Sequence, residues 1–510
     1  MPESIVFEVL VWSTLMLGAA LLFILVVASL GALYMYVVDQ HQTRNSIRRN
    51  YPLLGRSRNL LETLGTFLRQ YFFAMDREEL PFNRAQRSWV YRAAKDIDNT
   101  VAFGSTRQLR SVGSVMFLNT PYPHLDEEVA STDPLQLGPY ADQPYDAQQL
   151  FNVSAMSYGA ISRPAVRALS RGAARAGCWL NTGEGGLSTY HLEGNADLVF
   201  QIGTAKYGVR SRDGDLSEEK LKEVAAHGQV KMFELKLSQG AKPGKGGILP
   251  AEKVTEEIAA IRGIEAGKAS ISPNRHPEIE SETDLLDMLG RIRDVTGKPC
   301  GFKLAVGTTA WLDALCEEIH RRGVEHAPDF ITVDSGDGGS GAAPMALMDN
   351  VGLLLAESLP LVVDKLVEAG LRDRIRVVAS GKLVTPTEVA TALCLGADFT
   401  VSARGFMFAL GCIQAMRCNL NTCPTGVTTH DPKLQRGLVV ADKAQRVANY
   451  QKNVVKAVEM IAHSCGLAEP REFRRRHVRM MTERGLSVPL TALYPEAQPF
   501  GVTHVSRTER

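Results

Sequence analysis

Residues 329–341 read DFITVDSGDGGSG, an apolar run that leads directly into a glycine-rich polar loop. The interior of Asp329–Asp334 is aromatic and β-branched, which favours a buried strand. The loop that follows carries four glycines, so its backbone N–H groups can turn toward an anion. A strand that ends in such a loop is the unit from which parallel sheets with ligand sites at their carboxyl edges are built.

The same unit recurs between residues 151 and 402, where short apolar segments alternate with helical stretches, as is typical of βα units. Polar or glycine-rich loops follow most of the strands, and they read SAMSYG, NTGEGG, LSQGAKPGKGG, FKLAVG, DSGDGGSG and ASGKL. Eight strands are predicted, at Phe151–Met156, Cys178–Asn181, Val230–Leu237, Ala269–Ser272, Gly301–Val306, Asp329–Asp334, Ile375–Ser380 and Phe399–Ser402. We therefore predict an α/β fold, a (β/α)8 TIM barrel with its chemistry in the loops after the strands. Periodicity alone does not close a barrel, so a doubly wound sheet is the alternative.

The amino-terminal part of the chain has a different character. Val9 to Val38 contains no charged side chain, and about 20 apolar residues suffice to span a bilayer. The only charges ahead of this run are Glu3 and Glu8, whereas a cleaved signal peptide begins with a basic segment. Basic residues follow the run and predict its cytoplasmic side: Arg44, Arg48, Arg49, Arg56 and Arg58. We expect a single-pass membrane protein whose catalytic part lies in the cytoplasm.

Four regions are predicted from these patterns. They are a transmembrane helix at 1–38, a helical, basic membrane-proximal region at 39–145, a barrel at 146–465 and a basic tail at 466–510. The formal net charge is only +1, and 45% of residues are hydrophobic, so we expect a small-molecule substrate and no nucleic acid. The tail predicts a solvated basic helix face, with an electron-donor or lipid contact as the alternative, through Arg471, Arg474, Arg475, Arg476 and Arg479.

Three cysteines lie close together as Cys412-x5-Cys418-x4-Cys423, and Pro424 follows at once. Thiols at this spacing are a metal or redox signature, and three of them indicate a 3Fe-4S cluster. The alternative is that they are buried small hydrophobic residues. The remaining cysteines stand singly among apolar neighbours and are predicted to be core: Cys178, Cys300, Cys316, Cys394 and Cys465.

Late loops of the predicted barrel are suited to a phosphate group. Ser335–Gly341, Ser380–Lys382 and Ala397–Gly405 follow successive strands, and phosphate is often bound in the last loops of this fold. Tight turns are the alternative explanation for the glycines. No G-x-G-x-x-G motif follows an early strand, so the sequence favours FMN over a nicotinamide cofactor.

Taken together, these motifs resemble the FMN-binding synthase domain of the glutamate synthase family, especially its stand-alone bacterial members. The resemblance extends from Asn152 to His430. It rests on four motifs in one order: SAMSYG at 154–159, NTGEGG at 181–186, QGAKPG at 239–244 and the cysteine run that ends in Pro424.

The resemblance implies roles for individual residues. Glu184 would lie near the reacting carbon of the substrate. Lys242 and Arg262 would hold the carboxylates of 2-oxoglutarate, and Lys303 would contact the pyrimidine side of the flavin. Together with the glycine-rich loops, it implies FMN contacts from Ser154, Ala155, Met156, Ser157, Lys303, Asp337, Gly338, Gly339, Ser340, Gly341, Ser380, Gly381, Lys382, Ala403 and Arg404.

The reaction implied by the family is reductive amination. Ammonia adds to the 2-oxo group, water leaves to give an imine, and reduced flavin delivers hydride to form L-glutamate. Electrons would reach the flavin through the 3Fe-4S cluster from ferredoxin or a separate reductase. Neither an amino-terminal nucleophilic cysteine domain nor a nicotinamide-binding domain is recognised, so ammonia would arrive free or from a partner.

The sequence also departs from the family pattern. Ile248 stands where classical members carry a glutamine, Lys245 replaces a glutamate, and Gly336 replaces a histidine. Another 2-oxo acid or an amine therefore stays open as substrate. Two further alternatives are an FMN-barrel oxidoreductase or isomerase acting on a hydroxy acid or nucleotide, and a membrane-tethered redox scaffold without keto-acid turnover.

Overall fold

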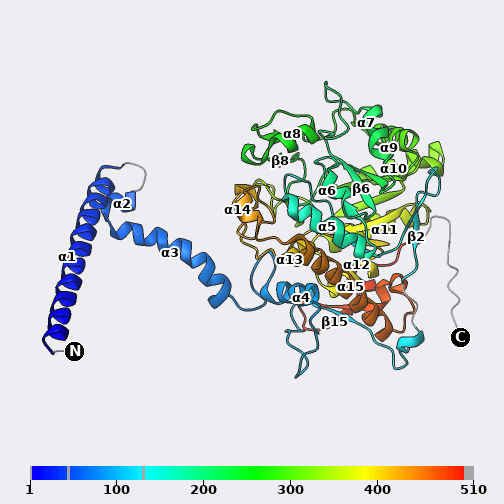
Figure 1. The fold of residues 1–510 in the computed structure, drawn as a ribbon. Coiled ribbons are helices and arrows are strands. Elements are labelled where there is room, and N and C mark those ends of the chain that lie inside the picture. Colours follow the sequence, from blue (N-terminus) through cyan, green and yellow to red (C-terminus); the bar gives the residue numbers. More distant parts are fainter. Residues whose placement is uncertain (1–2, 43–45, 129–131, 499–510) are drawn as a thin grey trace. The chain divides into compact units, whose positions relative to one another are not determined.

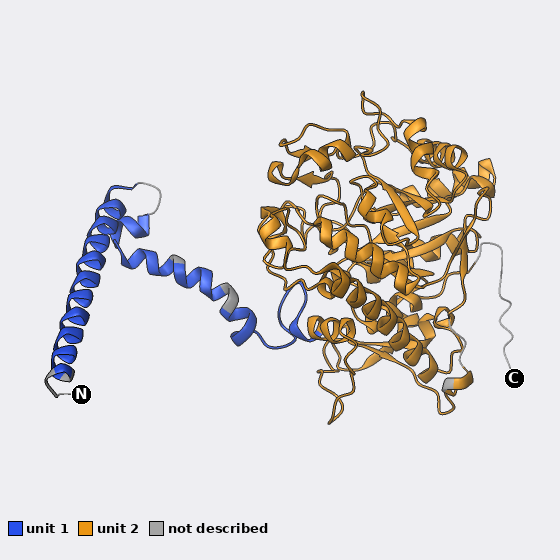
Figure 2. Cartoon of the chain, viewed as in Figure 1, with its two compact units in different colours: residues 1–85 blue, residues 86–510 orange. Residues whose placement is uncertain are grey.

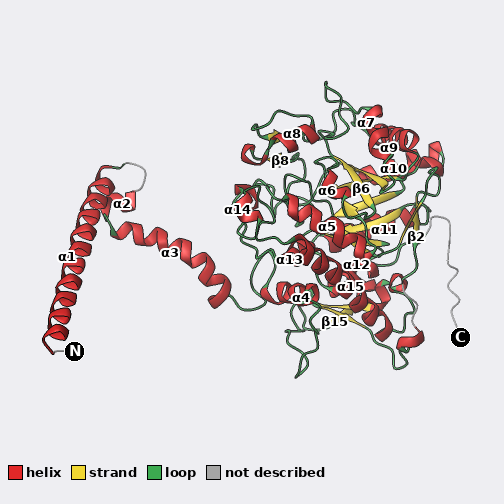
Figure 3. Ribbon diagram, in the orientation of Figure 1, coloured by secondary structure: helices red, strands yellow, loops and turns green. Residues whose placement is uncertain are grey.

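A computed structural model describes residues 3–42, 46–128 and 132–498 of the chain. The chain divides into two compact units, Met1–Ala85 and Gln86–Arg510, which are coloured separately in Figure 2. The second unit contains a closed barrel of parallel strands enclosed by helices (Figure 3). The predicted (β/α)8 barrel is thus confirmed, and the doubly wound alternative is excluded.

The eight barrel strands follow the chain in order around the barrel, and the last pairs with the first. They are β4 (Phe151–Val153), β5 (Leu180–Asn181), β6 (Leu198–Ile202), β7 (Val230–Lys236), β10 (Cys300–Ala305), β11 (Phe330–Asp334), β12 (Arg376–Ser380) and β13 (Phe399–Ser402). Every residue of β11 is buried, because strands of a parallel barrel are covered on both faces. Continuous apolar runs rather than alternating ones are the sequence signature of such strands.

One predicted barrel strand is wrong. Ala269–Ser272 contributes only β9 (Ser270–Ile271), which pairs antiparallel with β8 (Ile248–Leu249) outside the barrel. Ile271 is 63% exposed, so this short pair lacks the two covered faces of a barrel strand. The strand that the sequence analysis missed is β6, a fully buried five-residue run between Asp197 and Gly203.

Helices cover the outside of the barrel. They are α5 (Arg163–Ala176), α6 (Thr189–Leu192), α7 (Glu218–Ala225), α9 (Glu282–Thr296), α10 (Ala310–Arg322), α11 (Leu355–Glu368), α12 (Pro386–Cys394), α13 (Arg404–Leu410) and α15 (Val440–Ser464). Helix α5 starts at an N-cap serine, Ser162, whose hydroxyl accepts a hydrogen bond from the N–H of Ala165. It packs closely on α15, because a Cβ on Gly172 would lie only 2.5 Å from Val447.

A hairpin of β2 (Leu135–Leu137) and β3 (Tyr145–Ala147) packs against the side chains that fill the barrel. Leu137 is fully buried in this core, and the hydroxyl of Tyr145 donates a 3.0 Å hydrogen bond to Asp197. The core residues it joins include Trp179, Val199, Met232, Phe330, Val378, Phe399 and Val401. The predicted boundary at 145/146 therefore falls inside an element that belongs to the core of the second unit.

Outside the barrel, α4 (Arg84–Ala94) and β1 (Val115–Phe117) precede the hairpin, and α8 (Glu256–Arg262), α14 (Pro432–Gln435) and α16 (Leu490–Leu493) occupy later connections. Strand β1 pairs with β14 (Val478–Met481), which pairs in turn with β15 (Ser487–Pro489). This small antiparallel sheet joins the segment before the barrel to the segment after it.

The arginines of the tail do not form the predicted solvated helix face. They lie on 3₁₀ turns and on β14, and several bind groups of the second unit. Arg475 pairs with Asp364 at 2.6 Å, Arg471 donates to the carbonyls of Asp398 and Asp133, and Arg479 donates to Ser487. Arg471 and Arg475 thus bind the tail to earlier parts of the second unit.

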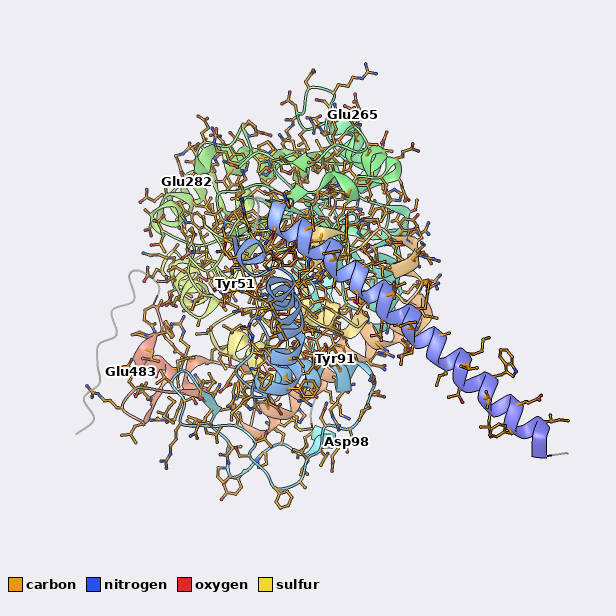
Figure 4. The ribbon with its side chains drawn as sticks, turned by 90° about the vertical axis from the view of Figure 1, so that its left-hand side faces the viewer. Tyr51, Tyr91, Asp98, Glu265, Glu282 and Glu483 are labelled. Atoms are coloured by element: carbon orange, nitrogen blue, oxygen red, sulfur yellow. The ribbon has the colours of Figure 1, made fainter. Side chains whose placement is uncertain are left out.

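The first unit consists of α1 (Glu3–His41), α2 (Ser46–Asn50), α3 (Leu54–Leu68) and a π-helical turn (Arg69–Phe73), drawn in blue in Figure 1. Within Phe7–His41 an 18-residue window has a mean hydropathy of 2.6 and no buried residue, and Figure 4 shows side chains standing out from this helix. Among the described residues this is the one helix apolar enough to cross a membrane, although signal sequences share these properties.

Asp39, near the end of α1, binds residues of α2 and α3. Its side chain is fully buried and accepts hydrogen bonds from Arg48 at 2.9 Å, from Arg56 at 2.8 Å and from the N–H of Leu53 at 3.2 Å. Several charge-assisted bonds to one carboxylate make a specific contact. The basic segment after the apolar helix is thereby folded back onto the helix end.

Candidate active site

A cavity of about 620 Å³, including its open mouth, lies at the carboxyl ends of the barrel strands. This is the end of the barrel at which TIM-barrel enzymes carry their active sites. Many predicted site residues line it: Ser154, Ala155, Ser157, Glu184, Lys303, Gly339, Ser380, Gly381, Lys382, Ala403 and Arg404.

Other predicted residues do not line the cavity. Lys242 and Arg262 are buried near Glu184 and interact with it electrostatically. Met156 is buried, and Ser340 bonds within its own loop to Ala342. Asp337, Gly338 and Gly341 also lie outside the lining. The structure therefore brings together residues that lie in or directly after β4, β5, β10, β12 and β13, and only part of the glycine-rich loop after β11.

Glu184 and Lys236 form a buried ion pair in the wall of the cavity. The Oε1 atom of Glu184 lies 3.0 Å from the Nζ atom of Lys236, and their side chains are 14% and 10% exposed. Burial alone raises the pKa of Glu184, but the positive charges of Lys236, Lys242 and Arg262 outweigh it and lower the pKa overall. The carboxylate is thus held in its charged form by three cations.

Two glycines leave room for this carboxylate. A Cβ on Gly247 would lie 2.3 Å from Oε1 of Glu184, and a Cβ on Gly203 would lie 2.6 Å from the Cβ of Glu184. No larger residue fits at either position without moving the acid. The glycines therefore fix the path of the Glu184 side chain into the cavity.

Lys242 and Arg262 supply further positive charge behind Glu184. Burial and the charge of Lys236 lower the pKa of Lys242 to about 8, although Glu184 opposes this. The Arg262 guanidinium donates to Ser270 and to the carbonyl of Tyr158, while its buried Nε has no hydrogen-bond partner in the described part of the chain. An unsatisfied buried donor costs about 1–3 kcal/mol, which an acidic ligand or a water would offset.

Lys303 enters the cavity from strand β10. Its Nζ atom lies 3.6 Å from Oδ1 of Asp334 and 3.4 Å from the hydroxyl of Ser380, and all three residues are buried. A buried lysine needs an anion nearby, and Asp334 supplies one. The ammonium therefore has a fixed position on the cavity wall.

The late loops present two cations to the same cavity. Lys382 pairs with Asp337 at 2.8 Å, and Arg404 donates to the Asp337 carbonyl at 3.3 Å. The backbone here is close-packed, because a Cβ on Gly339 would lie 2.8 Å from Arg404 and one on Gly381 would lie 2.3 Å from Ser335. Cations and exposed loop backbone in one place suit an anionic group such as phosphate.

Sequence reasoning missed five polar residues that line the cavity, namely Gln201, Lys236, Gln239, Asp334 and Ser402. Lys236 is the last residue of β7, just as Lys303 lies in β10, so a lysine at the carboxyl end of a barrel strand was the available signal. Gln201 donates a 2.6 Å hydrogen bond to the buried Glu234, which also accepts from Asn181 and Thr332. That network depends on contacts between four strands and had no sequence signal.

Residues 412–430, called the cysteine loop below, contain the three cysteines and follow α13, whose first residue Arg404 lines the cavity. The N–H of Gln414 donates to the Sγ atom of Cys412, and Cys423 contacts the hydroxyl of Thr425. Burial raises the pKa of Cys412 to about 12, and Cys418 and Cys423 add to the rise, so the three thiols are close enough to influence one another. Tyr91, labelled in Figure 4, donates from α4 to the Cys412 carbonyl at 2.6 Å.

No three His, Cys, Asp or Glu side chains in residues 3–42, 46–128 and 132–498 converge on a point suitable for one metal ion. An iron–sulfur cluster makes a different demand, because each cysteine ligates its own iron. Three neighbouring thiols, one with a backbone N–H directed at its sulfur, have the donor chemistry that such a cluster uses. The cysteine loop also touches the loop after β4, where His430 bonds the Gly159 carbonyl at 2.8 Å and Ser162 donates to Val427.

Comparison with known proteins gives consistent matches. The conserved region of glutamate synthases matches residues 129–468. A glutamate synthase large subunit-like protein of Bacillus subtilis is 40% identical over 491 residues, covering 89% of this chain and 93% of that one. The chain belongs to the glutamate synthase family. Membership makes it a glutamate synthase-like oxidoreductase.

Within the glutamate synthase family, this chain differs in extent from some relatives. An archaeal-type glutamate synthase [NADPH] of Thermotoga maritima is 34% identical, and the match covers 62% of this chain but only 59% of that protein. Among solved structures, the flavin-binding domain of baker's yeast flavocytochrome b2 is similar at 15% identity and a TM-score of 0.45, covering 83% of this chain and 86% of that one.

Proposed function

We propose that the protein catalyses the reductive amination of a 2-oxo acid with ammonia, using FMN as its hydride carrier. The observation that carries this proposal is Glu184 at the cavity wall, paired with Lys236 at 3.0 Å and influenced by Lys242 and Arg262. One acid among several cations suits a doubly negative substrate and a proton transfer in one place. The balanced reaction joins a 2-oxo acid, ammonia, two electrons and two protons to give an amino acid and water.

The residues present fit FMN. Lys382 and Arg404 would hold its phosphate, with the backbone of Gly339 and Gly381 close beside it. Lys303, fixed by Asp334 and Ser380, would face the pyrimidine side of the ring. When bound, the cofactor supplies the hydride that the amination needs. A cation at the pyrimidine side would favour the reduced, anionic ring.

The substrate would lie between the ring and Glu184. Arg262, whose Nε lacks a partner among the described residues, and Lys242 would attract its carboxylates. Glu184 would accept and return the proton exchanged at the amine nitrogen, with Lys236 holding the carboxylate in place. The cavity walls would fix the reacting carbon close to the hydride donor, which is where positioning contributes to rate.

The identity of the 2-oxo acid is a separate part of the proposal. 2-Oxoglutarate is the first choice because the family is named for glutamate formation. Ile248 in β8 is half-buried and Lys245 is exposed, and neither lines the cavity. Because these two positions depart from the family pattern, pyruvate and oxaloacetate should be compared with 2-oxoglutarate in any assay, and small amines with ammonia.

We further propose that Cys412, Cys418 and Cys423 hold a 3Fe-4S cluster that receives electrons from ferredoxin or a reductase subunit. The contacts of His430 and Val427 with the loop after β4 bring the cysteine loop next to the cofactor site. We also propose that α1 anchors the protein in the membrane, with the barrel in the cytoplasm, because its apolar side chains are exposed and arginines follow it.

Anaerobic stopped-flow absorbance of the photoreduced protein tests the reaction directly. We expect flavin reoxidation only when 2-oxoglutarate and ammonium are both present, with glutamate formed in proportion. Each compound alone and each alternative 2-oxo acid serves as a control. An intact flavin that stays reduced with every oxo acid and amine offered would refute the amination proposal and favour the redox-scaffold alternative.

A further inference from the structure

Lys253 is a buried cation beside the cysteine loop. It ends the 3₁₀ turn Ala251–Lys253 after β8, and only 2% of its surface is exposed. Its Nζ atom donates a 2.9 Å hydrogen bond to the carbonyl of Ala160 in the loop that follows β4. The neighbouring Glu252 accepts a bond through its carbonyl from Asn421 of the cysteine loop, so the turn packs against that loop.

Four other buried lysines of this protein have their charge or their donors matched. Lys206 pairs with Glu278 at 3.0 Å, Lys236 with Glu184, and Lys303 with Asp334. Lys298 directs its ammonium at the carbonyls of Ala225, His227 and Val230. A lysine ammonium has three donors, and a buried one without compensation is costly.

Lys253 is only partly compensated, because its ammonium has one hydrogen bond to a described residue for its three donors. In the described part of the chain no carboxylate lies within ion-pair distance of it, and its hydrogen bond to Ala160 is the one that the structure shows. The groups whose negative charge favours its protonated form are the sulfurs of Cys418 and Cys423. A cluster held by these cysteines would supply the negative charge that this buried cation lacks among the described carboxylates.

We propose that Lys253 is the counter-ion of the cysteine-bound cluster and sets its reduction potential higher than it would otherwise be. This inference rests on the proposed 3Fe-4S cluster. Reduction adds one negative charge to a cluster, and a fixed cation in a site of low dielectric stabilises the more negative state. The hydrogen bond to Ala160 fixes the ammonium to the loop whose earlier residues line the cavity, and the turn that carries Lys253 contacts the cysteine loop through Asn421.

The test is a redox titration of the full-length protein, followed by the electron paramagnetic resonance signal of the oxidised cluster. Lys253→Met removes the charge at similar size, and Lys253→Arg retains it. Lys433→Met is the matched control, because Lys433 lies in α14, shortly after the three cysteines, but is exposed to solvent. Iron, sulfide and flavin contents are measured for every variant.

We expect Lys253→Met to shift the cluster potential to more negative values, Lys253→Arg to stay near the parent protein, and Lys433→Met to shift it little. Loss of the cluster in Lys253→Met but not in Lys253→Arg, with flavin retained, also supports the counter-ion role. An unchanged potential in Lys253→Met, or loss of the cluster in both Lys253 variants, overturns it. Absence of iron from the parent protein refutes instead the proposed cluster itself.

Discussion

At the scale of single residues, the candidate site is defined by charged side chains that compensate one another. Glu184 is one acid among three cations, and its ion pair with Lys236 is buried. Taking charges out of water is expensive, so such a group persists only where the partners are close and fixed. Because positive charge exceeds negative charge around Glu184, the site is prepared for an anionic ligand.

The pH dependence of substrate binding is predicted from Lys242. Burial first, and then the charge of Lys236, lower its pKa to about 8, so it is an ammonium below that pH and loses its charge above it. We expect kcat/KM for the 2-oxo acid to fall above about pH 8, approaching roughly tenfold per pH unit. In Lys242→Arg the guanidinium stays charged, so this limb of the profile should disappear. An identical alkaline limb in both proteins would contradict the assignment.

The space around Glu184 yields a second prediction. In Gly247→Ala the new methyl would lie 2.3 Å from Oε1, so the carboxylate must move away from its place in the cavity wall. We expect a loss of kcat of at least about tenfold, since a shift of about 1 Å can cost a hundredfold, while bound flavin stays unchanged. Gly244→Ala is the control, because no atom lies within 4 Å of its Cβ position, although its φ of +74° adds backbone strain. Equal activity in Gly247→Ala and the parent protein would rule out a catalytic position for Glu184.

At the scale of elements, the short hairpin β2–β3 contributes to the hydrophobic core of the barrel. Its side chains Leu137, Tyr145 and Ala147 pack into the same cluster as the residues inside the barrel. A parallel barrel leaves apolar side chains at the end away from its active site, and these need a cover. The hairpin therefore belongs to the barrel's core although it precedes the first barrel strand.

Removing part of that cover should destabilise the whole second unit. Leu137 is fully buried, and truncating a buried leucine to alanine costs about 2–5 kcal/mol. We expect Leu137→Ala to lower the midpoint of chemical unfolding, measured by the intrinsic fluorescence of the protein. Leu135→Ala on the same hairpin, where the side chain is only partly buried, should have a smaller effect. Equal stability of the two variants would show that the hairpin is not part of the core.

At the scale of the whole molecule, the surfaces of the two compact units differ in polarity. The first unit exposes the apolar side chains of α1, and the second has a barrel core with a charged exterior. Exposed apolar surface of this extent marks an interaction with lipid or protein. The exposed apolar surface and the candidate active site therefore lie in different parts of the chain.

This separation predicts the behaviour of a shortened protein. A chain that begins at Arg84, where α4 starts, should stay in solution without detergent and retain its flavin, whereas the full chain should sediment with membranes. The measurement is ultracentrifugation of cell extracts, followed by flavin absorbance of each fraction. Membrane association of the shortened chain, or a soluble full chain with an intact amino terminus, would argue against α1 as the anchor.

The sequence predicted the barrel because apolar runs followed by polar loops recur in it. The prediction of individual strands was wrong where this local pattern was weak or also occurred outside the barrel. Ala269–Ser272 looked like a strand but has one exposed face, whereas Leu198–Ile202 was not predicted and forms β6. The tail arginines looked like a solvated surface, yet Arg475 binds Asp364 from a distant helix. Such pairings depend on contacts between remote parts of the chain.

By itself the sequence determined the family, the strand-to-loop units, the apolar amino-terminal helix and the grouping of three cysteines, since each is a local pattern of neighbouring residues. Only the tertiary structure decided that Lys236 pairs with Glu184, that Lys253 lies buried beside the cysteines, and that the hairpin joins the barrel core. The reason is physical. Charge compensation and burial depend on residues that are brought together from distant parts of the chain, and no local sequence pattern shows which residues those are.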